Sequence, residues 1–199
     1  RQFIGDVAHE LKTPLSGQRA ALELTLTRDR LKGEYKKAIE EALIDSGKIS
    51  ETLKNILDLA WSQAENAQKG ETVVNLTEIA EEMREIASKL AFGKDIAIGG
   101  KIGVEIKTNG RRDKLSRAFL NIIDNAVKFT PKKGTITIDL FKKDDRAVFR
   151  VKDAGIGIPE PELRHVFDRF YRGSRTGNTF GSGLGLAIAQ AVVKTHKGT

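Results

Sequence analysis

A change of hydrophobic period near residue 67 constrains this chain more than any other feature of its sequence. Before that point, apolar residues recur at alternating steps of three and four, the spacing of one face of an α-helix. After it, short alternating runs typical of strands are mixed with amphipathic helical stretches. A length of 199 residues leaves room for two modest domains. The pattern predicts a helical domain over 1–66, a linker over 67–71 and an α/β domain over 72–199.

The first 66 residues have the pattern of two helices joined by a short connection over 28–33. A heptad face runs through both helices, at Ile4, Ala8, Leu11, Leu15 and Leu22 and then at Ile39, Ala42, Ser46, Ile49, Leu53, Ile56 and Ala60. This repeat is typical of helix bundles, and a connection ending at Gly33 favours an antiparallel hairpin. Because two helices alone bury little surface, we expect a homodimer with a four-helix bundle. A plain coiled-coil spacer is the alternative.

The second part predicts helices and strands in a mixed order. Asn75, with Glu78 three residues later, predicts a helix start, and that helix extends to about Ala91. The other expected elements are strands at 96–98 and 104–107, a helix at 112–129, a strand pair at 135–142 and 147–153, and a helix at 184–195. Because no strict strand–helix–strand repeat is present, we expect a two-layer α/β sandwich with a mixed sheet, and an α+β fold class overall.

The net charge of +7 is concentrated in the second domain. Residues 1–66 carry a net −1 and residues 67–199 a net +8. A basic surface attracts nucleic acid, an anionic membrane or a polyphosphate, but an aromatic content of 6% disfavours stacking on nucleic-acid bases. The absence of cysteine excludes disulfides and thiolate chemistry. We expect no nucleic-acid partner and, because no apolar run is long enough to span a bilayer, no membrane contact within these residues.

His9 is the histidine whose neighbours suggest chemistry. It adjoins the heptad face but lies off it, so it should be exposed. Glu10 follows directly, Thr13 lies one turn on, and Pro14 bends the helix. An exposed neutral imidazole is a competent nucleophile, and an adjacent carboxylate can orient it and accept its proton. On spacing alone, an ordinary surface histidine is the alternative.

Two glycine-rich runs frame the other candidate site. The run DAGIGI (153–158) follows a predicted strand, and GSGLGL (181–186) opens a predicted helix. Glycines before a helix allow the backbone to approach an anion, which the helix N-terminus then favours. Neither run fits the Walker or dinucleotide motif, and either alone could be a turn. Because they bracket a loop with arginines at 164, 169, 172 and 175, we interpret them together as a phosphate site with a lid.

A third polar element lies on the predicted helix 112–129, between His9 and the first glycine run. Asn121 and Asn125 lie one turn apart on one face, opposite Ile122 and Ile123. Two amide oxygens on one face suit a Mg²⁺ ion that also binds phosphate oxygens, and Lys128 is close enough to reach the same anion. A solvated polar face is the alternative for this spacing alone.

Five segments together resemble the sequence boxes of two-component sensor histidine kinases, in the same order. FIGDVAHELKTPL (3–15) is similar to the H box, and NIIDNAVKFTP (121–131) to the N box. DAGIGIP (153–159) and GSGLGL (181–186) resemble the two glycine boxes, and FDRFYRG (167–173) the F box. The resemblance implies a dimerisation and histidine-phosphotransfer hairpin, followed by an ATP-binding domain of the Bergerat, or GHKL, type.

The resemblance also implies roles for individual residues. His9 matches the phosphoacceptor, Glu10 the acid that activates it, and Thr13 the residue used to dephosphorylate the partner. The implied reaction is ATP-dependent autophosphorylation of His9, followed by transfer to an aspartate in the receiver domain of a response regulator. Asp153 matches the carboxylate that binds the adenine amino group. The remaining implied ATP contacts are Asn121, Asn125, Lys128, Phe129, Gly155, Gly157, Ile158, Arg169, Gly181, Gly183, Leu184 and Gly185, with Mg²⁺ held by the two asparagines.

The family pattern adds expectations about the whole protein. Phe167 and Phe170 would anchor the lid, and the family's terminal strand hairpin is expected to be missing after position 199. We expect the chain to be the cytoplasmic portion of a bacterial inner-membrane sensor. Two other functions fit the same fold: a GHKL-type ATPase, which would not need His9-Glu10, and a catalytically silent dimeric scaffold that binds a response regulator.

Overall fold

The fold is described by a computed structural model, which covers residues 2–64, 72–177 and 181–199. The chain divides into two compact units, Arg1–Asp58 and Leu59–Thr199. This division falls inside a helix, before the predicted linker. The linker residues 67–71 lie outside the described part of the chain, so the predicted domain bounds stay a prediction.

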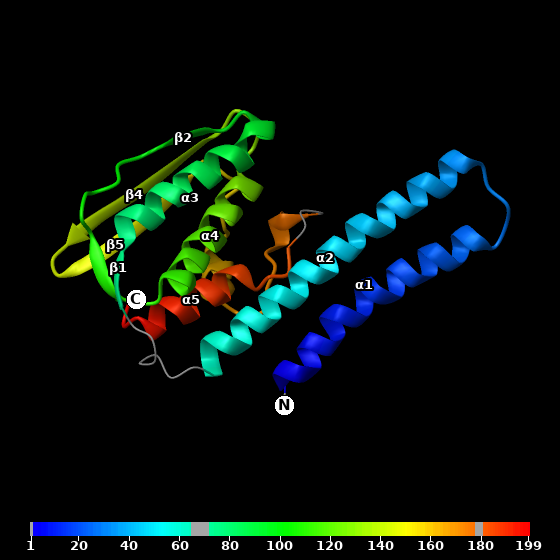
Figure 1. The fold of residues 1–199 in the computed structure, drawn as a ribbon, viewed down its shortest axis with the longest axis horizontal. Coiled ribbons are helices and arrows are strands. Elements are labelled where there is room, and N and C mark those ends of the chain that lie inside the picture. Colours follow the sequence, from blue (N-terminus) through cyan, green and yellow to red (C-terminus); the bar gives the residue numbers. More distant parts are fainter. Residues whose placement is uncertain (1, 65–71, 178–180) are drawn as a thin grey trace. The chain divides into compact units, whose positions relative to one another are not determined.

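The first unit contains two long helices, α1 (Gln2–Leu26) and the larger part of α2 (Lys32–Ala64), which run antiparallel (Figure 1). α1 continues through Pro14. Gln18, at a position in register with the heptad face, donates from Nε2 to the Ala42 carbonyl oxygen at 2.8 Å and links the helices. The hairpin prediction is confirmed in its main feature.

The predicted end of the connection at Gly33 was wrong, because α2 already begins at Lys32. The Leu31 backbone N–H donates to Glu34 Oε2 at 3.0 Å, and the Leu31 carbonyl oxygen accepts from the Glu34 and Tyr35 N–H groups. These reciprocal bonds define the start of α2 and place Gly33 inside the helix.

In the second unit, β1 (Thr72–Asn75) leads directly into α3 (Leu76–Ala91). The Asn75 side chain accepts from the Thr77 N–H at 3.1 Å and donates to Glu78 Oε1 at 3.0 Å. The predicted helix start is therefore confirmed. A short 3₁₀ helix, η1 (Phe92–Lys94), ends this segment.

The strands form two sheets. A mixed sheet has the order β2 (Ala97–Gly99), β4 (Thr135–Lys143), β5 (Arg146–Asp153), with β2 parallel and β5 antiparallel to β4. β1 pairs antiparallel with β3 (Lys107–Gly110) in a second sheet. The predicted strand at 104–107 was wrong, because pairing with β1 fixes the strand start at Lys107 and leaves Val104 in an exposed turn.

Helices cover one face of the mixed sheet (Figure 1). α3 and α4 (Arg112–Phe129) pack against its strands, and α5 (Gly185–Thr195) packs on α4. The Phe119 ring of α4 stacks on the Phe149 ring of β5, with centroids 3.7 Å apart. Side chains that are less than 2% exposed include Ile79, Ile123, Ile136, Ile138, Leu140, Leu184, Ile188 and Val192. The predicted two-layer α/β architecture is confirmed.

Candidate functional site

The polar face of α4 carries the two asparagines that the sequence pattern selected. Asn121 and Asn125 are both partly buried, one turn apart. The Asn121 Nδ2 atom is buried and has no hydrogen-bond partner among the described residues. Since a buried amide normally has a partner, this orphaned atom marks a position where a ligand could complete the bonding.

The start of α5 lies directly against this face. A Cβ at Gly185 would stand 3.7 Å from the Asn121 Cβ and 3.9 Å from its Oδ1. These are ordinary van der Waals distances, so they place the N-terminus of α5 beside Asn121 without requiring a glycine there. Leu184, the residue before it, is fully buried, so its side chain belongs to the core and only its backbone could contact a ligand.

The C-terminal end of α4 lies against the end of β5. A Cβ at Gly155 would stand 3.0 Å from the Phe129 carbonyl oxygen, closer than ordinary packing allows. The Gly155 N–H donates to Asp153 Oδ1 at 2.9 Å, which fixes the orientation of this exposed carboxylate. Asp153, Gly155 and Phe129 are thus brought together. Lys128 Nζ lies 2.6 Å from Asp124 Oδ2, an ion pair along α4.

The loop between the two glycine runs contains η2 (Glu160–His165) and η3 (Ser174–Thr176). Gly183 has a φ of +68°, and a Cβ there would stand 2.6 Å from the Phe170 carbonyl carbon. The Phe170 N–H donates to the Gly183 carbonyl oxygen at 3.1 Å. Phe170 therefore holds the loop to the second glycine run, whereas Phe167 leaves 45% of its surface exposed.

The Glu162 carboxylate links two parts of this loop. Glu162 Oε1 accepts from the Ser174 hydroxyl at 2.5 Å and from its backbone N–H at 3.3 Å. The hydrogen bond from the Ser174 hydroxyl, followed by those from the Ser174 backbone N–H and the Tyr171 side chain, holds the pKa of Glu162 below its usual value. Desolvation, together with the nearby Glu162 charge, raises the pKa of Tyr171.

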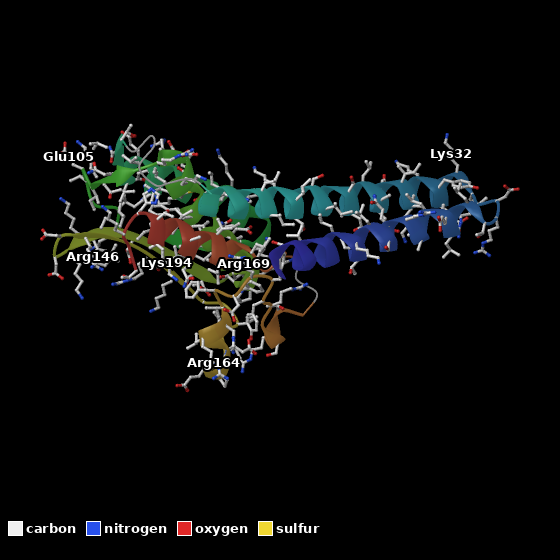
Figure 2. The ribbon with its side chains drawn as sticks, turned by 90° about the horizontal axis from the view of Figure 1, so that it is seen from below. Lys32, Glu105, Arg146, Arg164, Arg169 and Lys194 are labelled. Carbon is white, nitrogen blue, oxygen red and sulfur yellow. The ribbon has the colours of Figure 1, made fainter. Side chains whose placement is uncertain are left out.

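Other predicted residues are less closely placed. Gly157 has a φ of +64° in a turn, and Ile158 is half exposed. Among the residues that the structure describes, nothing approaches the Cβ position of Gly181 within 4 Å. Arg169 is exposed. Figure 2 shows the loop between the glycine runs projecting from the second unit, with Arg164 near its far end and Arg169 nearer the helices.

The predicted catalytic residues lie on α1. Thr13 is exposed, and the side chains of His9 and Glu10 lie outside the described part of the structure. Their exposure and geometry therefore stay predictions.

Sequence reasoning missed Lys94, in η1. Its Nζ donates to the carbonyl oxygens of Val127 and Lys128, each at 2.8 Å, and of Thr130 at 3.2 Å. The lysine and its acceptors are 33 to 36 residues apart, so no local pattern could reveal the contact. One signal was nevertheless present, because Pro131 cannot donate to the carbonyl four residues before it.

Comparisons with known proteins decide the family. A model of the His Kinase A (phospho-acceptor) domain matches residues 1–65, and one of the histidine kinase-, DNA gyrase B- and HSP90-like ATPases matches residues 110–199. A solved structure of the mycobacterial sensor histidine kinase MprB is 32% identical, with a TM-score of 0.55 over 64% of this chain and 80% of the solved chain. The chain belongs to the sensor histidine kinases. The predicted enzyme class, protein-histidine kinase, is thereby confirmed.

Two further relatives extend the comparison over both units. Sensor protein IrlS of Burkholderia pseudomallei is 33% identical over 202 residues, which cover 100% of this chain and 43% of IrlS. The histidine kinase ThkA, solved in complex with the response regulator protein TrrA, gives a TM-score of 0.75 over 99% of this chain and 55% of ThkA. At 19% identity, ThkA supports the fold alone. The chain spans less than half the length of the curated relatives it matches.

Two kinds of feature are absent from the described residues. Among residues 2–64, 72–177 and 181–199, no helix is both long enough and apolar enough to cross a membrane. The same residues contain no group of three or more histidine, aspartate or glutamate side chains placed to hold a metal ion.

Proposed function

We propose that this chain is the kinase core of a two-component sensor, which transfers the γ-phosphoryl group of ATP to His9 and then to a response regulator. The observation that carries the ATP site is the convergence of both glycine runs on α4. Gly185 adjoins Asn121 at the middle of the helix, and Gly155 adjoins Phe129 at its end. Family membership supports the reaction, since both matched domains are those of histidine kinases.

In this proposal the nucleotide lies along the polar face of α4. Asp153 accepts a hydrogen bond from the adenine amino group, and its orientation by the Gly155 N–H prepares it for that role. Lys128 and the exposed Arg169 neutralise phosphate charge. The backbone of Gly157, Ile158, Gly181, Gly183, Leu184 and Gly185 lines the pocket and its lid.

Mg²⁺ fits the asparagine pair of α4. Asn121 and Asn125 offer neutral oxygen ligands, which suit a small hard cation that keeps water and phosphate oxygens as its other ligands. The orphaned Asn121 Nδ2 supports a site for an oxygen-rich ligand here, because it could donate to a phosphate or a bound water. When bound, the ion would supply charge neutralisation at the phosphates.

The acceptor chemistry is assigned to α1. The His9 imidazole nitrogen forms a bond to the γ-phosphorus while the bond between that phosphorus and the bridging oxygen breaks, and ADP leaves. Glu10 orients the imidazole and accepts its proton. Phosphoryl transfer to an aspartate carboxylate of a receiver domain then regenerates His9. Thr13, which is exposed, would position water when the partner is dephosphorylated.

The hairpin supplies the proposed dimer contact. Apolar side chains of the heptad face stay exposed in the single chain, including Ile39 at 57% and Leu15 at 49%. Burial against a second copy would remove them from water. The receiver domain of a response regulator is the second proposed partner, supported by membership of the sensor histidine kinases and by the matched phospho-acceptor domain.

We also propose that the full-length protein is a membrane-anchored sensor, with these residues on the cytoplasmic side. This location is supported by the names of the relatives, which are sensor proteins more than twice as long as the part matched here. Fractionation of cells that express the natural full-length protein would test it.

Incubation with γ-labelled ATP and Mg²⁺ tests the reaction. We expect a protein label that is acid-labile and alkali-stable, as phosphohistidine is, and that passes to an added receiver domain. His9→Gln should abolish the label, whereas His165→Gln should keep it. Retention of the label in His9→Gln would overturn the assignment, and an unlabelled wild type that binds ATP would favour the silent scaffold.

A further inference from the structure

The last turn of α4 ends in carbonyl groups that its own sequence leaves without helical donors. A helix ends with four such carbonyls, and the usual remedy is a capping N–H from the following turn. For Val127 that donor would come from Pro131, which has no N–H. The Thr130 N–H cannot replace it, because it already donates to Ala126 at 3.0 Å.

Lys94 fills this gap from a distant segment. Its ammonium group has three protons and makes three bonds, to the carbonyl oxygens of Val127, Lys128 and Thr130. The positive charge also opposes the negative end of the helix dipole. The backbone of Lys94 is bonded to the turn that follows α4, since its carbonyl oxygen accepts from the Lys133 N–H at 3.0 Å.

Among the carbonyls of residues 127–130, Lys94 does not contact that of Phe129, which lies beside the proposed nucleotide site. The Phe129 carbonyl oxygen lies against Gly155, and Gly155 in turn binds the Asp153 carboxylate. The path from Lys94 to Asp153 therefore runs through a single helical turn, and Lys128 belongs to that turn. A shift of the turn would move the proposed adenine-binding carboxylate relative to the proposed phosphate-binding lysine.

We propose that Lys94 is a positioning residue of the nucleotide site, which sets the distance between the adenine and phosphate contacts of ATP. This inference rests on the proposed ATP site. Lys94 does not touch the nucleotide. It acts by fixing the last turn of α4, so its removal weakens ATP binding in protein that is still folded.

A purely stabilising role makes a different prediction, which kinetics can separate. A variant that only unfolds more easily has fewer active molecules, so its kcat per total protein falls while the folded fraction keeps its KM. A displaced helical turn instead raises the KM for ATP and leaves kcat at saturating ATP nearly unchanged. The two roles therefore affect different constants.

The experiment compares Lys94→Met with Lys94→Arg and with Lys132→Met, a matched loss of an exposed lysine in the turn that follows α4. Autophosphorylation KM and kcat, the Kd of a non-hydrolysable ATP analogue and the melting temperature are measured for each. We expect Lys94→Met to raise KM and Kd about fivefold with kcat within about twofold. Lys94→Arg, which keeps a cation with several donors, should recover most of the affinity, and Lys132→Met should match the wild type.

Each outcome decides the proposal. An unchanged KM in Lys94→Met, or an Arg variant as impaired as the Met variant, would overturn it. If Lys94→Met does not fold, Lys94→Gln, which keeps one amide donor, is measured in its place, and an unchanged KM there has the same meaning. Failure of the ATP site itself is distinguishable: then the wild type would not bind the analogue saturably, or Asp153→Asn would bind it as well as the wild type.

Discussion

The two units of this chain place their apolar residues differently. In the second unit, the inward faces of α3, α4, α5 and β4 bury one another, and side chains such as Ile123 and Ile138 are completely enclosed. In the hairpin, large apolar side chains such as Leu22, Ile39 and Leu43 stay at least 37% exposed. The second unit has a core of its own, whereas the hairpin has an apolar face that its own two helices leave exposed. We therefore expect substitutions in the two units to affect different equilibria.

The largest expected effect is on association. Ile39→Glu places a charge on the heptad face, and a symmetric dimer contains the change twice. Since burial of one such side chain contributes about 1.5–3 kcal/mol, the dimer dissociation constant should rise by about 10²- to 10⁴-fold. Sedimentation over a range of concentrations would measure it. Ser50→Glu adds the same charge at an exposed polar position and should leave the dimer intact. Equal dimer dissociation constants for Ile39→Glu and the wild type would show that the heptad face at Ile39 is not part of the interface.

The converse substitution lies in the core of the second unit. Ile123→Ala leaves a cavity beneath α4, and should lower the free energy of unfolding of this unit by about 2–5 kcal/mol while the dimer persists. Denaturant titration at a wavelength that reports on this unit would measure the loss. The neighbouring Ile122, which is only partly buried, serves as the control. Ile122→Ala should lower the free energy of unfolding clearly less than Ile123→Ala. Similar losses for the two would mean that α4 is not packed as described.

A smaller effect distinguishes the loop of the second unit from its core. Gly183→Ala puts a Cβ into the Phe170 backbone at a positive φ, so it should cost about 1–3 kcal/mol. Gly181→Ala, in the same glycine run, meets no atom within 4 Å and should change the free energy of unfolding by less than about 0.5 kcal/mol. Denaturant titration of both variants checks the difference, which disappears if Phe170 does not hold the loop at Gly183.

Local patterns predicted the elements whose ends depend on local bonds. The cap formed by Asn75 and Glu78 fixed the start of α3. The bounds of α4 at Arg112 and Phe129 agree with its amphipathic pattern and with the turn residues around it. The β4–β5 hairpin followed from alternation around a short polar turn. In each case the bonds that determine the element join residues close in sequence.

Features that depend on distant contacts were missed or displaced. β1 was not predicted, since its four residues form a strand through pairing with β3, and that pairing also moved β3 to Lys107–Gly110. Lys94 contributes through carbonyls more than 30 residues away. In the candidate site, the glycines and asparagines could be identified from the sequence because their residue types and spacing suit the binding of an anion and of Mg²⁺. The contacts of Gly185 with Asn121 and of Gly155 with Phe129 required the fold.

The smallest expected effect concerns pH and the loop that Glu162 holds. Bonds from Ser174, with Tyr171 and the Arg175 charge, lower the pKa of Glu162 in the folded protein, so the ionised form is the one that makes the contact. A carboxylate with a depressed pKa contributes fully above its unfolded pKa and loses its contribution as pH falls through the folded value. The protection factor of the Ser174 amide, which is the ratio of its intrinsic to its observed exchange rate at the same pH, should therefore be insensitive to pH near neutrality and fall only in acid.

Variants of the two glutamates of η2, Glu160 and Glu162, test whether the Glu162 carboxylate causes this pH dependence. Glu162→Gln should expose the Ser174 amide to faster exchange already at neutral pH and remove the acid-dependent step, because the neutral amide accepts more weakly. Glu160→Gln, an exposed neighbour, should reproduce the wild-type profile. Tyr171 should keep donating at alkaline pH, because desolvation and the Glu162 charge both raise its pKa. An acid-dependent step that survives in Glu162→Gln would assign the titration to another group of the loop.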